Sequence, residues 1–445
     1  MPTNPDRIII SGLGLISPLG LNAWQTFTAL LAGRTLADRA QRLPAQTSPV
    51  NLVRAIGCVN NCRQTMVDPT IEIAERVARE ATTDASVDLR HLPCYLGTSK
   101  GAVHSLTATL NNLANRPAQI SVAMDTALPV ALGPHGYLDQ HLHHRLGLDI
   151  RQHVVSACAS SLHALHNARL ALLDTKRTKA PSQALVLTAE SAMLPLFIHS
   201  YLRLGVLAPP TVKDYLALPL DERRTGFMLA EMGAAVVMER TNRIAPGQIE
   251  LIDTALASES HDLIRPSPNM HALAHVAEQL VSRHGVDVLH PHAPGTIDHD
   301  PVEMNVYSKL ISDFHFRELT GKTSAVLASQ TNPKIRNLTD SNATQAVKNP
   351  HISSPKIYAC KGATGHGLGA AGLVSLVIAC LCAKTNRLPP MPWLSHPIDC
   401  PLPLSPAASN LPPNSTHGLF AAGFAGHVAG AVIRQHPARN RALAN

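Results

Sequence analysis

The chain has 445 residues, which is long enough to bury one large core or two fused cores. Hydrophobic residues make up 45% of it and charged residues only 16%, a globular composition that excludes a largely disordered protein. The formal net charge is +7, but the lysines and arginines are scattered and are not interleaved with aromatic side chains. A nucleic-acid groove requires that interleaving, so we expect no nucleic-acid partner.

The eight cysteines stand at irregular spacings, which fits reduced thiols in a cytoplasmic protein better than a small disulfide scaffold. No basic N-terminal segment leads into a long apolar stretch, and no run reaches about 18 uncharged apolar residues. We therefore expect neither an export signal nor a membrane span.

Short runs of strand-forming residues alternate with helical stretches along the chain. They are residues 7–10, 153–155, 184–187, 234–238, 249–252, 286–289 and 357–359. This alternation indicates an α/β fold with buried strands.

The first strand leads into a turn at residues 17–20 and then into a short helix. Asn22 is placed to cap this helix and Gly33 to end it. Trp24 and Phe27 recur with residues 30 and 31 on one face, so we expect that face to be buried.

Two later strand-to-helix units place chemistry at their turns. In the first, residues 156–160 connect a strand to a helix whose apolar residues recur with helical spacing, and Cys158 lies in the turn. In the second, residues 361–366 follow a strand and precede the apolar helix 373–383. The two halves of the chain are thus expected to have a similar arrangement of strands and helices.

Residues 330–356 and 388–414 lack periodicity. They predict a surface excursion and a long irregular connection, respectively.

A cysteine at the start of a helix meets free N–H groups and partial positive charge, so we expect the pKa of Cys158 to be lowered. A cysteine that follows two valines is equally typical of a small core residue. The neighbouring motifs must decide between the two interpretations.

Two histidines supply that context. His292 follows a buried strand on a loop with glycine and proline, and His366 precedes the small residues 369–372, which permit close backbone approach. His290 and His292 also match a metal pair, although no cysteine or carboxylate lies at tight ligand spacing nearby. If these residues form one site, both rings should lie within about 6 Å of the Cys158 sulfur.

The order of these features resembles the β-ketoacyl-acyl-carrier-protein synthases of the elongating type, in the thiolase-like superfamily, over residues 8–433. Residues 156–160 match the nucleophile motif [TS]-A-C-[AS]-[SG], and residues 10–20 resemble the opening G-x-G-x-x-[ST]-P-x-G. His292, Thr296, Asp300 and Glu303 follow H-G-T-G-T-x-x-x-D-x-x-E, and residues 361–366 are similar to K-S-x-x-G-H. A dinucleotide fingerprint is excluded, because Ser17 stands where its third glycine belongs.

The resemblance implies a five-layered αβαβα fold of two similar halves, residues 1–250 with Cys158 and residues 251–445 with His292, Lys361 and His366. It implies an acyl carrier protein as partner, substrates carried on phosphopantetheine, and no metal or other cofactor. It also implies a homodimer, or a heterodimer with a related subunit.

The resemblance also assigns roles, beginning with Cys158 as the acyl acceptor. The amides of Cys158 and Phe424 would form the oxyanion hole, with the Phe424 ring as a gate, and His292 and His366 would donate hydrogen bonds to the malonyl carbonyl. Lys361 would act through structure and charge. Thr296 would bind pantetheine, and Met193, Phe197 and Tyr201 would line an acyl tunnel.

The sequence departs from the family pattern at several of these places. Pro294 replaces a threonine, and Ser375 stands where a glutamate commonly pairs with the lysine that corresponds to Lys361. Ala422 and Ala425 alter the turn at residues 421–426, called here the Gly-Phe turn. A synthase of a polyketide or specialised-lipid pathway with a partner subunit is therefore an alternative, as is an inactive scaffold. A thiol hydrolase fits less well, because no Asn or Asp visibly orients either histidine.

Overall fold

The computed structural model describes residues 6–38, 68–115, 124–176, 180–208, 217–320 and 354–437. The predicted excursion at residues 330–356 lies outside these ranges except for its end.

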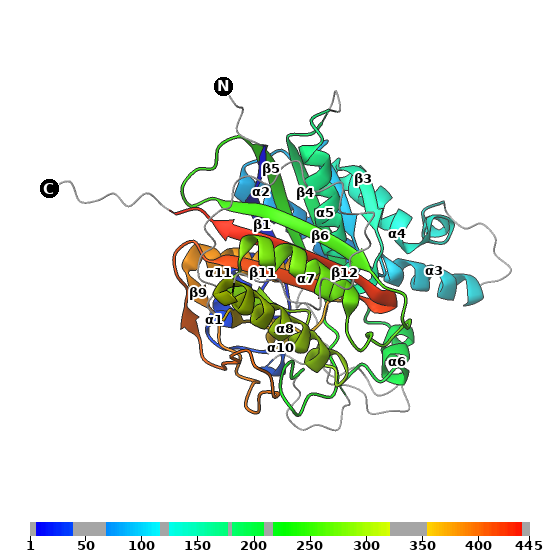
Figure 1. The fold of residues 1–445 in the computed structure, drawn as a ribbon. Coiled ribbons are helices and arrows are strands. Elements are labelled where there is room, and N and C mark those ends of the chain that lie inside the picture. Colours follow the sequence, from blue (N-terminus) through cyan, green and yellow to red (C-terminus); the bar gives the residue numbers. More distant parts are fainter. Residues whose placement is uncertain are drawn as a thin grey trace.

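One ten-stranded sheet runs through the molecule in the order β3-β2-β4-β5-β1-β6-β12-β11-β7-β8 (Figure 1). Its strands are β1 (Arg7–Ile16), β2 (Pro93–Gly97), β3 (Asp149–Val154), β4 (Gln183–Glu190), β5 (Met232–Thr241), β6 (Ile249–Ser258), β7 (Val288–His290), β8 (Lys356–Ile357), β11 (Thr416–Ala422) and β12 (His427–Gln435). β9 (Arg387–Leu388) and β10 (Ser409–Asn410) form a separate pair inside the predicted irregular connection.

The two halves of this sheet have the same topology. In each half the first strand pairs antiparallel with the fifth, the fifth antiparallel with the fourth, and the fourth, second and third lie parallel. The halves meet where β1 pairs with β6 through Ile9 and Ile10. The predicted boundary between residues 250 and 251 falls just inside β6, which is topologically the first strand of the second half.

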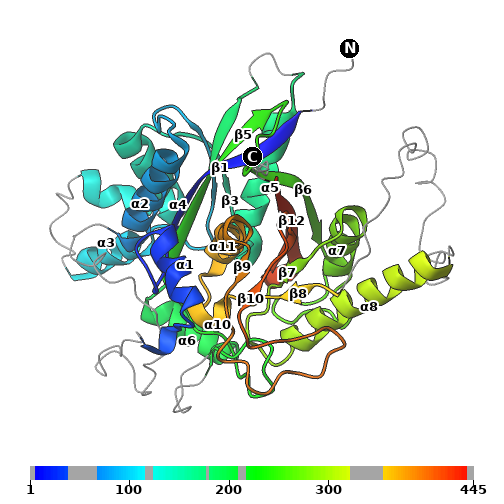
Figure 2. The same cartoon turned by 90° about the vertical axis from the view of Figure 1, so that its left-hand side faces the viewer.

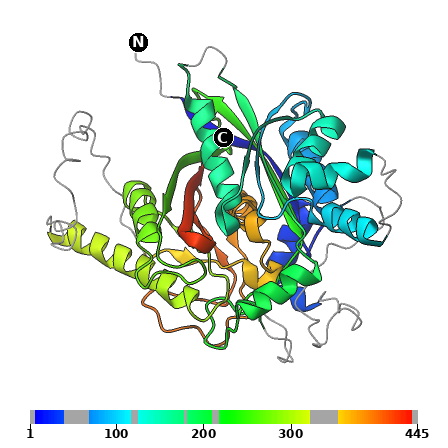
Figure 3. The same ribbon diagram turned by 90° about the vertical axis from the view of Figure 1, so that its right-hand side faces the viewer.

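Helices separate and cover the two half-sheets in five layers, as the fold prediction requires (Figure 2). α2 (Pro69–Ala85) and α4 (Met124–Leu146) cover the outside of the first half-sheet, and α7 (His271–His284), flanked by α8 (His299–Thr320), covers the outside of the second. Between them lie α5 (Ser160–Leu173) and α11 (Ala371–Thr385), which Figure 3 shows from the opposite side. The other α-helices among the described residues are α1 (Ala23–Leu31), α3 (Val103–Asn115), α6 (Pro195–Arg203) and α10 (Lys361–Thr364).

The central position of α11 explains its composition. Residues Leu368–Thr385 are long and apolar enough to cross a membrane, with a mean hydropathy of 1.9, but 89% of this stretch is buried inside the protein. A helix that is apolar on all sides is the expected core helix when sheets lie on both of its faces. In the residues that the structure describes, this is the one stretch of that kind.

The local predictions for α1 are mostly confirmed. The Asn22 side chain accepts the N–H of Gln25 at 2.8 Å and caps the helix, and Phe27 is fully buried. Trp24 was expected on the same buried face, but 55% of it is exposed. The expectation is therefore wrong for Trp24, which lies in the first turn of the helix.

Glycines in β1 allow α2 to pack at very short distance. A Cβ added at Gly14 would stand 2.2 Å from the carbonyl oxygen of Val77, and one at Gly12 would stand 2.0 Å from that of Ala81. The Leu15 amide donates to Glu80 of α2 at 2.9 Å. The paired glycines therefore serve strand-to-helix packing and not phosphate binding.

We predict that Gly14→Ala lowers the free energy of unfolding by about 2 kcal/mol, because the added methyl group forces β1 and α2 apart. Urea unfolding followed by circular dichroism measures this loss. Gly136→Ala in α4 is the matched control, since the nearest atom to its added Cβ is 3.4 Å away. A helical glycine with room should gain up to about 1 kcal/mol on this change. Equal effects of the two substitutions would contradict the packing argument.

Candidate active site

Cys158 lies in the turn between β3 and α5. Ala157 has a φ of +49°, a left-handed conformation that is costly for residues with branched side chains. The Ser160 hydroxyl holds the turn, because it accepts the N–H of Ser156 at 2.8 Å and donates to the carbonyl of Ala157 at 2.7 Å. The thiol therefore stands at the N-terminal end of a central helix, with 7% of the residue exposed.

His292 lies in the loop after β7, and its main chain is held from two sides. The amides of His292 and Ala293 each donate to the buried carboxylate of Glu303 in α8, at 2.7 Å. Lys361 Nζ donates to the carbonyl of His292 from the other side. Burial pushes the pKa of Glu303 upward, but the His299 ring, 3.3 Å away, and the two amides outweigh burial and lower it. An ionised carboxylate thus fixes the position of the loop.

His366 follows α10 and is held by the strand-like segment before β5. Its amide donates to the carbonyl of Met228 at 2.7 Å, and its carbonyl accepts from Ala230 at 3.1 Å. The Leu368 amide donates to the ring at Nδ1, at 3.1 Å. Because Nδ1 accepts this bond, the proton of the neutral ring lies on Nε2.

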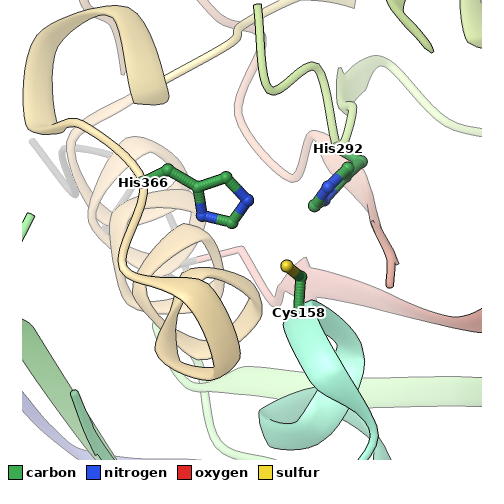
Figure 4. A group of neighbouring side chains, drawn as sticks. All are labelled: Cys158, His292 and His366. Carbon is green, nitrogen blue, oxygen red and sulfur yellow. The ribbon is translucent and has the colours of Figure 1, made fainter. Parts of the chain in front are cut away.

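Folding brings the sulfur and the two imidazoles together from three distant segments (Figure 4). The Cys158 Sγ and one ring nitrogen from each of His292 and His366 all lie within 4.8 Å of one another. The ring centroids of the two histidines are 5.3 Å apart. This geometry satisfies the condition that both rings lie within about 6 Å of the sulfur.

Burial dominates the ionisation of all three groups. Removal from water raises the pKa of Cys158 to about 12, although the charge of Lys361 opposes that rise. The predicted lowering of this pKa is therefore wrong, because the cost of placing a thiolate in a dry site exceeds the help from the helix terminus. Burial, with the charge of Lys361, also lowers the pKa of His292 and His366 well below 6.5. The resting site is electrically neutral at its centre.

One thiol and two imidazoles at this spacing also have the composition of a metal site. Coordination through His366 Nε2 would move the ring proton to Nδ1, where it would oppose the Leu368 amide. Two facing donors are unfavourable, so the ring is arranged to donate a hydrogen bond and not to bind a metal ion. The alternative metal pair fails as well, because the His290 ring bonds His417 at 3.0 Å in a separate buried pair.

Lys361 is buried, and burial lowers its pKa. Its hydrogen bond to the His292 carbonyl makes it part of the support for that loop. Ser375, at the position where the resemblance leads one to expect a glutamate, contacts Cys360 Sγ at 3.3 Å. The lysine is thus fixed by a main-chain carbonyl in this protein.

A cavity of about 190 Å³ opens at the sulfur and contains most of the predicted site. Cys158, His292, His366, Thr296 and Phe424 all line it. The Gly-Phe turn passes close to the nucleophile, since a Cβ added at Gly423 would stand 3.1 Å from the amide nitrogen of Cys158. The proposed oxyanion donors therefore belong to neighbouring backbone segments.

The three side chains expected to line an acyl tunnel lie beside this cavity. Met193, Phe197 and Tyr201 belong to a small hydrophobic cluster that also contains Phe227. The Phe227 ring lines the cavity and has its centroid 4.9 Å from that of His366 and 5.8 Å from that of Tyr201. Phe227 and Phe424 thus belong both to this cluster and to the cavity wall.

Sequence reasoning underestimated the residues that support the His292 loop. Arg224 donates to the carbonyls of Thr296 and Ile297, at 3.0 and 2.8 Å, and Glu303 was noted only as part of a motif. His299 was missed, although its spacing of four residues from Glu303 on one helix face was a visible signal.

Comparison with known proteins identifies a family for this chain. The family described as "Beta-ketoacyl synthase, N-terminal domain" matches residues 5–243, and "Beta-ketoacyl synthase, C-terminal domain" matches residues 324–394. The 3-oxoacyl-[acyl-carrier-protein] synthase 2 of Coxiella burnetii is 24% identical over 419 residues, which cover 88% of this chain and 89% of that protein.

Two solved structures extend the likeness to the fold. One is a type II polyketide synthase acyl-carrier protein in complex with its ketosynthase, which matches with a TM-score of 0.76 at 18% identity and covers 97% of this chain and 100% of that one. The other is the ishigamide ketosynthase/chain length factor, with a TM-score of 0.72 at 19% identity, covering 97% and 100%.

We predict that alkylation of Cys158 by iodoacetamide accelerates about tenfold per pH unit between about pH 7 and pH 9, without a plateau. The reason is that a thiol with a pKa of about 12 is almost wholly protonated in this range, so each added unit multiplies the thiolate fraction by ten. Peptide mass spectrometry against time measures the rate, with Cys158→Ser as the control for site identity. A rate that levels off below about pH 9 would show a thiol of ordinary or lowered pKa.

Proposed function

This chain belongs to the β-ketoacyl synthase family and is a condensing acyltransferase, and we propose that Cys158, His292 and His366 carry out its reaction. The observation that supports this assignment most is the convergence of one buried sulfur and two buried, neutral imidazoles on a single cavity. The reaction is the decarboxylative condensation of an acyl group with a malonyl thioester.

In the first step Cys158 attacks the acyl thioester of a carrier. The sulfur–acyl bond forms as the carrier thiol leaves, and the leaving thiol receives the proton that Cys158 gives up. The amides of Cys158 and Phe424 are proposed to stabilise the tetrahedral oxyanion. The neutral thiol is suited to this exchange, because no charge has to persist in the cavity before or after it.

In the second step the malonyl thioester loses carbon dioxide. His292 and His366 are proposed to donate to its thioester carbonyl, so that the electron pair released from the carboxylate is held as an enolate. The enolate carbon then attacks the acyl–Cys158 carbonyl and releases a β-ketoacyl carrier and the Cys158 thiolate, which takes a proton. The Nε2–H that Leu368 enforces on His366 supports this donor role.

We propose that this chemistry uses no metal or redox cofactor, since hydrogen-bond donors alone can stabilise the enolate. The substrates are proposed to arrive on the phosphopantetheine of an acyl carrier protein, as the relative's name and the ketosynthase–carrier complex suggest. Thr296, at the cavity wall, is the residue proposed to meet the pantetheine. Met193, Phe197 and Tyr201 remain proposed acyl contacts, in the hydrophobic cluster beside the cavity.

We also propose that the protein forms a dimer through the β3 edge. β3 ends the sheet (Figure 1). Exposed apolar side chains lie on elements near this edge. They are Leu110 and Leu113 on α3, Val130 and Leu132 on α4, Val155 after β3 and Leu170 on α5. A second copy fits this edge, and so does a related subunit such as the one named with the ishigamide ketosynthase.

The substitution His366→Ala separates the two steps. We expect it to leave formation of the acyl–Cys158 enzyme unchanged and to slow condensation with malonyl carrier by about 10²-fold or more, because one enolate donor is lost. Intact-protein mass reports the acyl enzyme, and product mass reports condensation. Cys158→Ala should abolish both steps. If wild-type protein releases free acid in place of a β-ketoacyl product, the chain is a hydrolase.

We predict that Leu170→Glu shifts the protein from dimer toward monomer, because it places a charge in the proposed apolar interface. Sedimentation velocity across a concentration series measures the shift. Trp24→Glu is the control, since Trp24 is comparably exposed but lies on α1. A wild-type protein that sediments as a monomer at all concentrations would refute the dimer.

A further inference from the structure

One charged side chain stands against the hydrophobic cluster that is proposed to receive the acyl chain. Lys100 lies in the loop between β2 and α3, and its Nζ is 5.3 Å from the centroid of the Phe197 ring. Phe197 packs against the cluster that contains Met193 and Tyr201. Lysine side chains usually extend into water, so an ammonium group held over a ring of an apolar cluster indicates a specific role.

The loop that carries Lys100 is fixed on two sides. The Ser99 amide donates a hydrogen bond to Glu190 Oε1, and Glu190 is buried at the end of β4. Gly101 has a φ of +67°, and a Cβ added there would stand 2.8 Å from the carbonyl oxygen of Pro134. The position of the ammonium group over the ring therefore depends on a well-supported backbone.

The ammonium group also lies within electrostatic reach of the nucleophile. Burial raises the pKa of Cys158 to about 12, and the charges of Lys361 and Lys100 oppose this rise. The cluster adjoins the cavity at the sulfur, because Phe227 and Phe424 belong to both. The cluster therefore connects the cavity with the Lys100 ammonium group.

The charge of Lys100 is only partly balanced by protein groups. Among the residues that the structure describes, Lys100 Nζ forms no hydrogen bond or ion pair, and its contact is the Phe197 ring. Its charge acts on Glu190, but burial raises the pKa of Glu190 to about 7, so about half of these carboxyl groups are neutral at pH 7. A cation without an ion pair, beside an apolar cluster, is suited to bind an oxygen that a ligand supplies.

We propose that Lys100 selects acyl groups whose chain carries an oxygen that accepts a hydrogen bond, either a carbonyl or a carboxylate. This inference rests on the proposed function, because the chain of acyl–Cys158 has to enter the cluster. The methylene groups of such a chain contact Met193, Phe197 and Tyr201, and the oxygen accepts from Lys100 Nζ. A chain without that oxygen removes water from the ammonium group and supplies no acceptor in its place, so the site disfavours it.

The test compares acyl groups of equal length that differ in one oxygen function. The pairs are butyryl with succinyl, hexanoyl with adipoyl, and octanoyl with suberoyl, all as pantetheine thioesters. A hexanoyl group with a keto oxygen at its penultimate carbon is the neutral carbonyl arm. Intact-protein mass against time measures the rate of acyl–Cys158 formation. The ratio of the two rates within one protein cancels any effect that a substitution has on the thiol itself.

Three variants identify the residue responsible. Lys100→Met keeps a long side chain without its charge, and Lys100→Arg keeps the charge. Lys309→Met is the matched control, because it removes an exposed lysine of α8. We expect wild-type protein to react about tenfold faster with the oxygenated member of the pair whose length fits, as a hydrogen bond to a charged group predicts. Lys100→Met should lose this ratio, whereas Lys100→Arg and Lys309→Met should keep it.

Either of two results overturns the proposal and leaves the proposed function intact. In one, wild-type protein reacts faster with the plain chain at every length. In the other, Lys100→Met keeps the wild-type ratio. A ratio that Lys100 controls for the dicarboxylic chains alone identifies a carboxylate as the ligand group, and one that extends to the keto chain identifies any acceptor oxygen. If wild-type protein forms no acyl–Cys158 from any thioester, the proposed function fails and this inference fails with it.

Discussion

Two hydrogen bonds from backbone amides to one buried carboxylate position the loop on which the site depends. Glu303 holds the amides of His292 and Ala293, and Lys361 binds the carbonyl of the same His292. These contacts link α8, the loop after β7 and α10 into one unit. A histidine on an unsupported loop would lose positional precision, and precision is what a hydrogen-bond donor to a transient oxyanion requires.

The duplicated topology explains why the reactive groups meet. Cys158 follows β3 and precedes α5, and His366 follows β8 and precedes α11, so they occupy equivalent places in the two halves. The central helices lie side by side between the half-sheets, and their N-terminal ends bring these residues together. His292, after β7, is added from the second half alone. The site therefore depends on the packing of one half against the other.

Local secondary structure could be predicted from the sequence, but few of the long-range contacts could. Strand positions around β1, β4, β5 and β6 followed from runs of β-forming residues, and the Asn22 cap followed from local hydrogen-bond chemistry. β2, β11 and β12 were not predicted, because each carries a glycine that weakens its run of strand-forming residues. The convergence of Cys158, His292 and His366 came from motif resemblance, since no local pattern specifies contacts between residues so far apart along the chain. The contact of Phe227 with the rings of both Tyr201 and His366 depends on packing that no motif encodes.

The wrong expectation for the Cys158 pKa shows that burial determines the protonation states of the groups in the site. The partial positive charge at a helix terminus stabilises a thiolate only modestly. Removal from water destabilises the charged form of every ionisable group. The same burial that raises the thiol pKa keeps both imidazoles neutral. Neutral imidazoles donate without adding charge of their own, and the enolate is then the largest new charge in the cavity. Burial strengthens electrostatic effects, so a fixed charge such as that of Glu303 acts more strongly at this site than it would in water.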